Sequence, residues 1–296
     1  MLMPFNEDKS IDYGALNNLI EFYLNAGAKG LFANCLSSEM FQLTKEEMLE
    51  SVSFIVEQVN GRVPIVATGT FGGPIEQQAA FVKEIYKTGI QSVIVITSLL
   101  TGQEDSEEVF RSNVKKLLTL TEDIPLGFYE CPVPYKRVID PVFLGELVQT
   151  GRIKYHKDTS LDIENIKSKI AVTTGIEDFG LYDAYMAHAV DSLLAGTAGL
   201  SCIQGNYFPE LVVWLCDHYG DDTQRDKVNE VQQFFIDQMD VMHYAYPTAA
   251  KYFLQKDQNW LGTACRRNDI EELDEEAKIK LNKLKADYEK LRTRIF

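Results

Sequence analysis

The chain has 296 residues, of which 45% are hydrophobic and 25% charged, and its formal net charge at pH 7 is -15. A chain of this length and composition can bury a large core, so a globular protein is expected rather than a disordered one. The acidic balance argues against nucleic-acid and membrane partners, because phosphate backbones and anionic lipid headgroups repel such a surface.

The sequence also bears on the compartment. No run of 18 apolar residues and no basic segment followed by a short apolar one is visible, so neither a membrane span nor a secretory signal is expected. The five cysteines, Cys35, Cys131, Cys202, Cys216 and Cys265, are scattered and show no C-x-x-C spacing. An odd number without a framework favours reduced thiols and therefore a cytoplasmic protein.

Short apolar segments alternate with longer stretches of helical periodicity along the first two thirds of the chain. The segments of strand length are 28–36, 63–72, 90–100, 124–132, 153–160, 170–177 and 192–202, with Met1–Phe5 as a candidate for the end of an eighth. The clearest helix covers 44–60, where Thr44 and Glu47 match a T-x-x-E capping box and Gly61 follows as a stop signal. After about residue 223 the pattern is only helical.

This alternation predicts a parallel sheet covered by helices on both faces. Eight such units in 200–250 residues are typical of a (β/α)₈ TIM barrel, so we predict an α/β barrel over 1–222 and a C-terminal helical domain over 223–296. A doubly wound open sheet is the alternative. It is disfavoured because no G-x-G-x-x-G follows the first strand and because the strand count approaches eight.

One predicted strand, 153–160, carries lysines where aliphatic residues are expected. Side chains alternate along a strand, so Lys157 and Tyr155 are predicted to point into the barrel while Lys154 and His156 point toward the helices. His156 is therefore expected to be a packed residue of the helix layer rather than a catalytic base. Lys157 lies at the carboxyl end of the strand, where barrel enzymes place their chemistry.

An inward lysine in a barrel must be neutral or paired with an acid. A neutral amine in an apolar pocket can attack a carbonyl group and form a Schiff base, whose protonated nitrogen draws electrons from an adjacent bond. The alternative is a lysine at the barrel rim that pairs with Asp158 or Glu177 and carries no chemistry.

Two further strand ends suit the same chemistry. Tyr129 ends the preceding strand and is expected beside Lys157, where a phenol can transfer protons, although it also fits an ordinary core tyrosine. The stretch NCLSSEM, 34–40, places Ser37, Ser38 and turn amides where they can bind a carboxylate, with Glu39 ordering the turn; a plain serine turn is the alternative.

Three cysteines, Cys35, Cys131 and Cys202, also fall at predicted strand ends. A zinc site is not predicted from them, because no zinc-ligand spacing joins them and small apolar residues are expected at such positions.

These motifs, in this order, resemble the dihydrodipicolinate synthase and N-acetylneuraminate lyase family of class I aldolases. The family's blocks are T-P-F, G-[TS]-T-G-E, Y-N-x-P, G-[IVL]-K-[DE]-[ST]-[ST], G-x-x-G-x-I-S and N-x-x-P. Their counterparts here are MPF (3–5), CLSSE (35–39), YECP (129–132), YHKDTS (155–160), GTAGLSC (196–202) and NYFP (206–209), and YPTAAKYFL (246–254) resembles a block of the family's helical domain.

The resemblance implies that Lys157 forms the Schiff base with a 2-oxo acid, usually pyruvate, and that Tyr129 is the proton-transferring phenol. Ser37, with the amides of Leu36 and Ser37, would bind the carboxylate, and Ser201 would belong to the substrate-binding set. The family fold is a barrel with a C-terminal helical domain, and a homotetramer or homodimer is implied. The covalent Schiff base through Lys157 implies that no metal or organic cofactor is needed.

Departures from the family pattern argue against dihydrodipicolinate synthesis itself. Leu36 replaces the first threonine of the G-T-T-G-E block, Leu99 and Leu100 stand where the synthase has a tyrosine that crosses the subunit interface, and Pro134 replaces an arginine that grips the aldehyde substrate. Without that threonine and tyrosine the proton relay of the synthase is missing.

A polar stretch instead suggests a sugar acid. TGIED, 174–178, resembles the segment that neuraminate lyases use for sugar hydroxyls, so Gly175, Glu177 and Asp178 are assigned to substrate binding, with a solvated loop end as the alternative.

The function expected from the sequence is therefore a Schiff-base lyase or aldolase acting on pyruvate or a sugar-derived 2-keto-3-deoxy acid. The alternatives are a dehydratase on the same lysine, dihydrodipicolinate synthase, and a barrel that binds a 2-oxo acid without turning it over.

Overall fold

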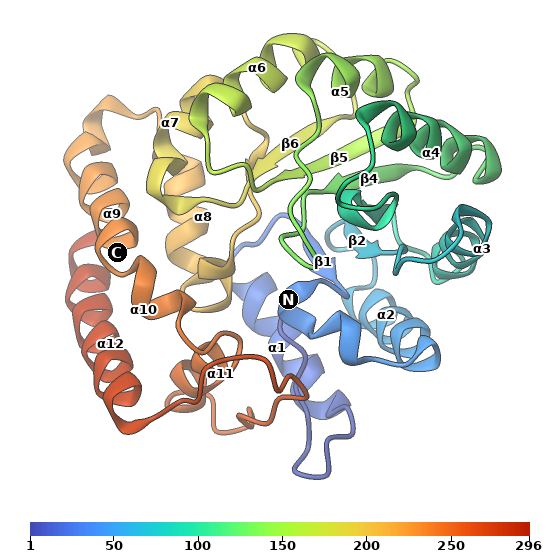
Figure 1. Cartoon of the computed structure of the whole chain (residues 1–296). Helices are drawn as coiled ribbons and strands as arrows, with labels where there is room; N and C mark the ends of the chain where they lie inside the picture. The colour runs from blue at the N-terminus through green and yellow to red at the C-terminus, as the bar shows by residue number, and fades with distance from the viewer.

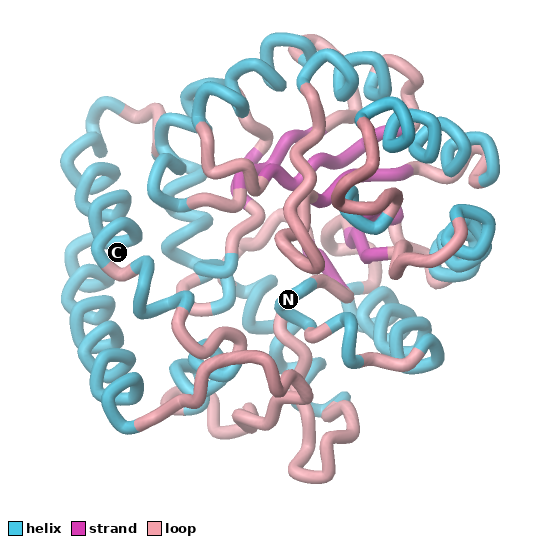
Figure 2. Tube along the Cα trace, in the orientation of Figure 1, coloured by secondary structure: helices cyan, strands magenta, loops and turns pink.

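The computed structural model describes residues 1–296 and shows seven parallel strands in one curved sheet surrounded by helices (Figure 1 and Figure 2). Neighbouring strands follow chain order. The strands are β1 (Leu31–Ala33), β2 (Ile65–Thr68), β3 (Ser92–Ile96), β4 (Leu126–Tyr129), β5 (Ile153–Asp158), β6 (Gly180–Asp183) and β7 (Gly199–Leu200). This arrangement confirms the predicted TIM-barrel class with additional C-terminal helices.

Helices connect and cover the strands. Those of the barrel are α1 (Tyr13–Asn25), α2 (Lys45–Val59), α3 (Ile75–Tyr86), α4 (Glu107–Leu120), α5 (Pro141–Val148), α6 (Ile163–Thr173), α7 (Ala189–Ala195) and α8 (Pro209–His218). Those of the C-terminal segment are α9 (Arg225–Asp237), α10 (Met239–His243), α11 (Thr248–Gln255) and α12 (Glu275–Ile295). The capping box of Thr44 and Glu47 is present at the start of α2, as predicted.

The structure corrects two strand predictions. Met1–Phe5 forms no strand, since Phe5 makes only a single antiparallel bridge to Ile11 and Pro4 has no N–H to donate to a ladder. Residues 170–177 are the last turn of α6 and the loop after it, and the strand that follows is β6. The β-branched residues of 170–177 suggested a strand, but Asp162 caps the helix that runs through them.

The sheet separates two apolar regions. The larger one lies between the sheet and the helices and extends from the N-terminal residues to Ile295, so one continuous core supports the barrel and the C-terminal helices. The smaller one lies inside the barrel and consists of Phe32, Cys35, Met40, Ile94, Ile96, Tyr129 and Cys131. Along β3, Val93 and Val95 join the larger region while Ile94 and Ile96 join the smaller one, as strand alternation requires.

An irregularity between β4 and β5 sets the register at the centre of the sheet. Leu126 pairs with Ile153 and Gly127 pairs with Tyr155, so Lys154 is skipped and Tyr129 comes to lie opposite Lys157. Gly127 is required there, because a Cβ atom would come within 2.8 Å of the Tyr155 carbonyl oxygen.

The C-terminal segment is fastened to the barrel by a buried acid. Glu39, which follows the short helical turn Leu36–Ser38, accepts hydrogen bonds from Lys251 Nζ on α11 at 2.9 Å and from the backbone amides of Arg266 and Arg267. Glu39 was expected to order its own turn, but it binds the distant segment instead. The division at residues 222 and 223 into two domains stays a prediction.

Lys251→Met is expected to lower the free energy of unfolding by about 3 kcal/mol, because it leaves the Glu39 carboxylate buried without its cation. Urea denaturation measures the change. Lys167→Met is the matched control, since Lys167 and its partner Glu164 are exposed and surface pairs contribute little. Equal stabilities of Lys251→Met and the parent chain would contradict a fastening role for Glu39.

Candidate active site

Lys157 lies on the inner face of β5, as predicted, close to aromatic rings and thiols. Its Nζ atom is 4.7 Å from the ring centroid of Tyr129 and 5.6 Å from that of Phe32. The residue is only 9% exposed, and its amine makes no ion pair and no hydrogen bond with the chain. Burial lowers the pKa of Lys157 below the ordinary 10.5, although the thiols of Cys35, Cys202 and Cys131 act in the opposite direction.

The other two buried lysines, Lys169 and Lys251, each form ion pairs with buried carboxylates. Lys169 Nζ lies 2.6 Å from Glu130 and 2.5 Å from Asp158, and Lys251 Nζ lies 2.9 Å from Glu39. Lys157 therefore differs from both, because it is the buried lysine left without a carboxylate. The predicted alternative, in which Lys157 pairs with Asp158 or Glu177, is not what the structure shows.

Tyr129 lies directly opposite Lys157 at the end of β4. Its ring packs edge-on against Phe32, with the centroids 5.7 Å apart. Burial raises the pKa of Tyr129 well above 10, and the neighbouring thiol of Cys131 adds to this effect. The phenol therefore holds its proton before a substrate binds, so it can donate this proton first and act as a base afterwards.

The turn after β1 brings donors to the same mouth of the barrel. Leu36–Ser38 is a single helical turn, and the backbone amides of Leu36 and Ser37 donate to no group in the chain. Ser37 is 8% exposed, and its Oγ atom accepts a hydrogen bond from Tyr246 at 2.6 Å. Leu36 packs against the apolar group around Tyr129.

Ser201 follows β7, and its Oγ atom accepts a hydrogen bond from the Tyr155 hydroxyl at 2.8 Å. Tyr155 stacks on Tyr182 at 4.7 Å inside the barrel. The structure therefore connects Ser201 to the inner face of β5, where Tyr155 and Lys157 are two residues apart.

The three residues assigned to sugar binding lie elsewhere, which corrects that assignment. Gly175, Glu177 and Asp178 are exposed and precede β6, so they stand at the amino-terminal end of the strands, opposite to the end that carries Lys157. Asp178 is 83% exposed at its side chain and approaches Lys154 at 3.8 Å. The misplaced strand over 170–177 caused the error, since it reversed which end of the strand this loop follows.

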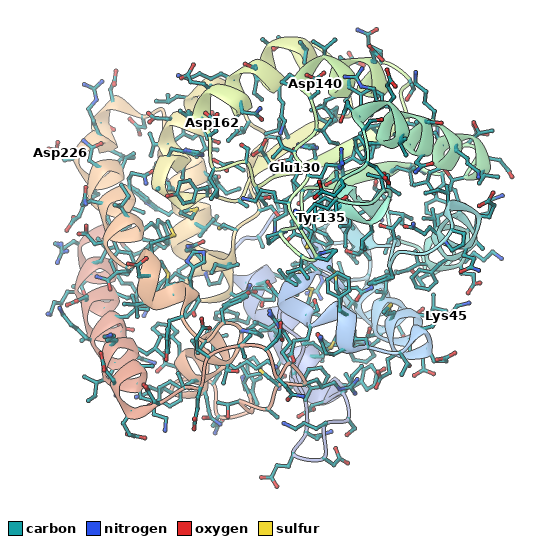
Figure 3. The ribbon with its side chains drawn as sticks, in the orientation of Figure 1. Lys45, Glu130, Tyr135, Asp140, Asp162 and Asp226 are labelled. Carbon is teal, nitrogen blue, oxygen red and sulfur yellow. The ribbon has the colours of Figure 1, made fainter.

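A buried polar cluster lies on the opposite face of β4 and β5, between the sheet and α6. It consists of Glu130, His156, Asp158 and Lys169, none of which is exposed. His156 Nε2 is 3.2 Å from Glu130, so His156 is a residue of the helix layer, as predicted. Burial alone would raise the pKa of Glu130, but His156 and Lys169 outweigh it and hold the pKa at about 2. Figure 3 labels Glu130 within the ring of helices.

Glu130, His156 and Asp158 have the spacing of metal ligands, with their ligand atoms within 4.8 Å of one another. The ammonium of Lys169 already lies between the two carboxylates, so one of their two negative charges is compensated by the chain's own cation. At two of these positions the family blocks have other residues, because Glu130 stands at the asparagine of Y-N-x-P and His156 at an aliphatic position.

Two polar residues near Ser37 were missed by the sequence reasoning. Tyr246 and Asn206 lie in the blocks YPTAAKYFL and NYFP, yet neither was given a role. Their only signal was that each begins a block with a family counterpart, and the contact of Tyr246 with Ser37 joins residues 209 positions apart.

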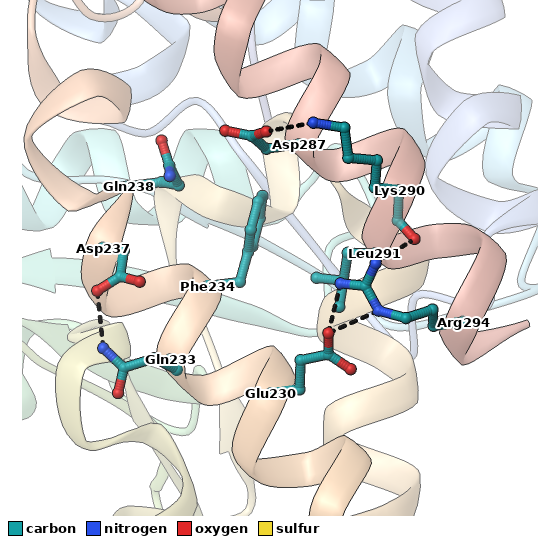
Figure 4. Close-up of a pocket in the computed structure, with 9 residues that line it drawn as sticks. All are labelled: Glu230, Gln233, Phe234, Asp237, Gln238, Asp287, Lys290, Leu291 and Arg294. Carbon is teal, nitrogen blue, oxygen red and sulfur yellow. Dashed lines mark hydrogen bonds and ion pairs between the residues drawn. The ribbon is translucent and has the colours of Figure 1, made fainter.

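A groove between α9 and α12 has a volume of about 310 Å³ and lies away from the strand ends (Figure 4). Four of its charged residues pair with one another, Glu230 with Arg294 and Asp287 with Lys290, and Asp237 accepts a hydrogen bond from Gln233. Among the helices, none combines the length and the apolar character needed to cross a membrane.

Comparisons with known proteins agree with this geometry. A model of the Dihydrodipicolinate synthetase family matches residues 1–286. The 4-hydroxy-tetrahydrodipicolinate synthase of Oceanobacillus iheyensis is 28% identical over 218 residues, which are 72% of this chain and 71% of that protein. The enzyme of the same name from Shewanella baltica is 26% identical over 219 residues, 73% of this chain and 72% of its own.

Solved structures share the fold. Dihydrodipicolinate synthase DapA-2 from Bacillus anthracis superposes with a TM-score of 0.86 at 19% identity, covering 97% of this chain and 95% of that one. YagE, a prophage protein from E. coli K12 solved in complex with pyruvate, has a TM-score of 0.84 at 21% identity and covers 98% and 96%.

Lys157→Met is expected to raise the free energy of unfolding at pH 7. The folded pKa of Lys157 lies below 10.5, and each unit of this difference corresponds to about 1.4 kcal/mol. Between the two pKa values only the unfolded chain holds the proton, so the gain is complete below the folded pKa and disappears as the pH approaches 10.5. Urea denaturation at pH 7 and at about pH 9 measures it.

Lys169→Met serves as the opposite case. It leaves Glu130 and Asp158 buried without their ammonium and is expected to cost about 3–5 kcal/mol. If Lys157→Met destabilised the chain as Lys169→Met does, Lys157 would be a paired structural cation after all.

Proposed function

Because the chain belongs to the Dihydrodipicolinate synthetase family, we propose that it is a class I lyase that forms a Schiff base between Lys157 and a 2-oxo acid. The observation that carries this proposal is the buried amine of Lys157, which has no acidic partner and lies over the ring of Tyr129. The ammonium form is disfavoured in such an interior, so an unpaired lysine there is suited to react as a neutral amine.

The chemistry starts from the neutral amine. Lys157 Nζ attacks the C2 carbonyl carbon of the 2-oxo acid, and the oxygen receives one proton from Nζ and one from the phenol of Tyr129. Water then leaves, and a protonated imine and a phenolate remain. The positive imine then stabilises the phenolate of Tyr129, which becomes the base.

In the cleavage direction, this phenolate removes the proton from the C4 hydroxyl of a 2-keto-3-deoxy acid. The C3–C4 bond breaks, its electrons pass to the imine to form an enamine, and an aldehyde leaves. Protonation of C3 and hydrolysis of the imine release pyruvate and restore Lys157. The carboxylate would be held by the Ser37 hydroxyl and by the free amides of Leu36 and Ser37, which face no partner of their own.

The two proposed substrates, pyruvate and a sugar-derived 2-keto-3-deoxy acid, are not equally well supported. Pyruvate as the 2-oxo acid is supported by the carboxylate donors and by the pyruvate bound to YagE, a protein of the same fold. A sugar-derived 2-keto-3-deoxy acid no longer has Glu177 and Asp178 in its favour. A dehydratase would use the same imine and expel water in place of the aldehyde.

Dihydrodipicolinate synthesis is the second candidate, since the curated relatives carry that activity in their names. Leu36 and Leu99 both pack against the apolar group around Tyr129, so neither position offers a hydroxyl to the phenol. The proton relay that the synthase builds from these positions has no counterpart at them.

The remaining proposals concern assembly and compartment. A homotetramer or homodimer is proposed from the family, and light scattering after size exclusion tests it. All five cysteines are unpaired, which supports a reducing, cytoplasmic setting.

Borohydride reduction in the presence of pyruvate is expected to leave a stable adduct on Lys157, located by peptide mass spectrometry. Lys157→Arg should abolish the adduct, whereas Tyr129→Phe should slow its formation by about 10²–10⁴-fold, since the proton donor is lost. Lys154→Arg, near the start of the same strand, is the matched control and should keep the adduct. The absence of any adduct with a panel of 2-oxo acids would rule out Schiff-base catalysis.

The same panel separates the reaction types. With 2-keto-3-deoxy sugar acids, a lyase releases pyruvate together with an aldehyde, while a dehydratase releases water and keeps the carbon chain intact. With pyruvate and aspartate semialdehyde, the synthase would consume both. Mass spectrometry of the products distinguishes these outcomes.

A further inference from the structure

A chain of hydrogen bonds runs from α1 to the proposed carboxylate site. Tyr23 Oη donates to Asn206 Oδ1 at 2.6 Å, Asn206 Nδ2 donates to Tyr246 Oη at 2.7 Å, and Tyr246 Oη donates to Ser37 Oγ at 2.6 Å. Tyr23, Asn206 and Ser37 are buried, and Tyr246 is half-buried. Tyr246 comes from the segment between α10 and α11, so the C-terminal helices contribute directly to the barrel mouth.

The direction of this chain follows from its first member. The backbone N–H of Leu2 can only donate, and it donates to Tyr23 Oη at 3.3 Å. Tyr23 therefore has its own hydrogen left for Asn206, whose amide group then presents Nδ2 to Tyr246, and Tyr246 in turn donates to Ser37. In the reverse orientation the hydroxyl hydrogen of Tyr23 would have no acceptor in a buried position, which is unfavourable.

The Ser37 hydroxyl therefore accepts a hydrogen bond from Tyr246, while its own hydrogen remains free to be donated. No group of the chain accepts from Ser37 Oγ, and the amides of Leu36 and Ser37 are free as well. Three donors without an acceptor in the chain thus lie on two adjacent residues of the turn. Burial raises the pKa values of Tyr23 and Tyr246, so both phenols stay protonated and keep donating.

We propose that Tyr246 is a positioning residue that orients the Ser37 hydroxyl as a donor toward the carboxylate of the 2-oxo acid. This inference rests on the proposed function, because the carboxylate belongs to the substrate of Lys157. A hydroxyl that already accepts a bond is also a stronger donor, since hydrogen bonds in a chain polarise one another. Without Tyr246, the Ser37 hydroxyl can rotate and turn its hydrogen away from the carboxylate.

The test uses the full-length protein and measures the borohydride-trapped adduct on Lys157 as a function of pyruvate concentration. Tyr246→Phe is expected to raise the half-saturating pyruvate concentration about tenfold, the loss typical of a weakened hydrogen bond to a charged group. The plateau of adduct at saturating pyruvate is expected to stay unchanged, because Lys157 and Tyr129 are untouched. A general structural defect would lower the plateau as well.

Two controls isolate the role of the carboxylate. Tyr207→Phe removes a comparable phenol, which donates to the Met242 carbonyl at 2.8 Å and does not contact Ser37, and should leave the half-saturating concentration unchanged. Methyl pyruvate keeps the ketone but has no anionic carboxylate, so Tyr246→Phe should raise its half-saturating concentration less than that of pyruvate.

A double-mutant cycle shows whether Tyr246 acts through Ser37. Ser37→Ala alone should raise the half-saturating pyruvate concentration, and adding Tyr246→Phe to it should cause no further rise. Effects that multiply, or a Tyr246→Phe variant within about twofold of the parent chain, would overturn the inference while leaving the proposed function intact. If the parent chain itself forms no adduct with pyruvate or another 2-oxo acid, the proposed function fails, and this inference fails with it.

Discussion

The ion pairs of Lys169 with Glu130 and Asp158 determine how the two central strands present their inner faces. Both acids are at the ends of β4 and β5, and one ammonium on α6 binds both, at 2.6 and 2.5 Å. Because side chains alternate along a strand, holding Glu130 and Asp158 on the outside directs Tyr129 and Lys157 inward. The two faces of one pair of strands are therefore electrostatic opposites, with paired charges outside and an unpaired amine inside.

The unpaired amine of Lys157 lowers the free energy of unfolding, and the rest of the fold compensates for this loss. Burial disfavours the ammonium form, which lowers the pKa of Lys157 and keeps more of it in the nucleophilic form, although the neighbouring thiols oppose this effect. Sites that need a perturbed pKa commonly accept such a cost. The larger core between the sheet and the helices is continuous with the C-terminal helices and provides the compensating stability.

The C-terminal segment also takes part in the site. Lys251 binds Glu39 and Tyr246 binds Ser37, so two residues of the turn after β1 are held by side chains more than 200 positions away. At Leu36 and Leu99 this chain lacks the hydroxyl groups of the synthase pattern, and the phenol of Tyr246 contacts Ser37. This tyrosine serves the proposed carboxylate site rather than a relay across subunits.

Much of the fold could be predicted because its signals are local. Alternating apolar strands and amphipathic helices predict a barrel, and a lysine at a strand end beside a tyrosine predicts the inward pair. Residues 170–177 were misassigned because a β-branched stretch at a helix end looks like a strand when its cap at Asp162 is not considered. That single error moved Glu177 and Asp178 to the wrong end of the barrel.

The sequence by itself thus determined the alternation of strands and helices, the inward direction of Lys157 and the position of the turn at Ser37. Hydrophobic periodicity and the place of a residue along a strand depend only on nearby residues. Three features were decided only by the tertiary structure. Lys154 has no partner in the register of β4 and β5, which aligns Lys157 with Tyr129. No carboxylate lies beside Lys157, and Tyr246 approaches Ser37. These features depend on which distant segments meet across the barrel. Neither the hydrophobic periodicity of the sequence nor the spacing of its motifs encodes such contacts.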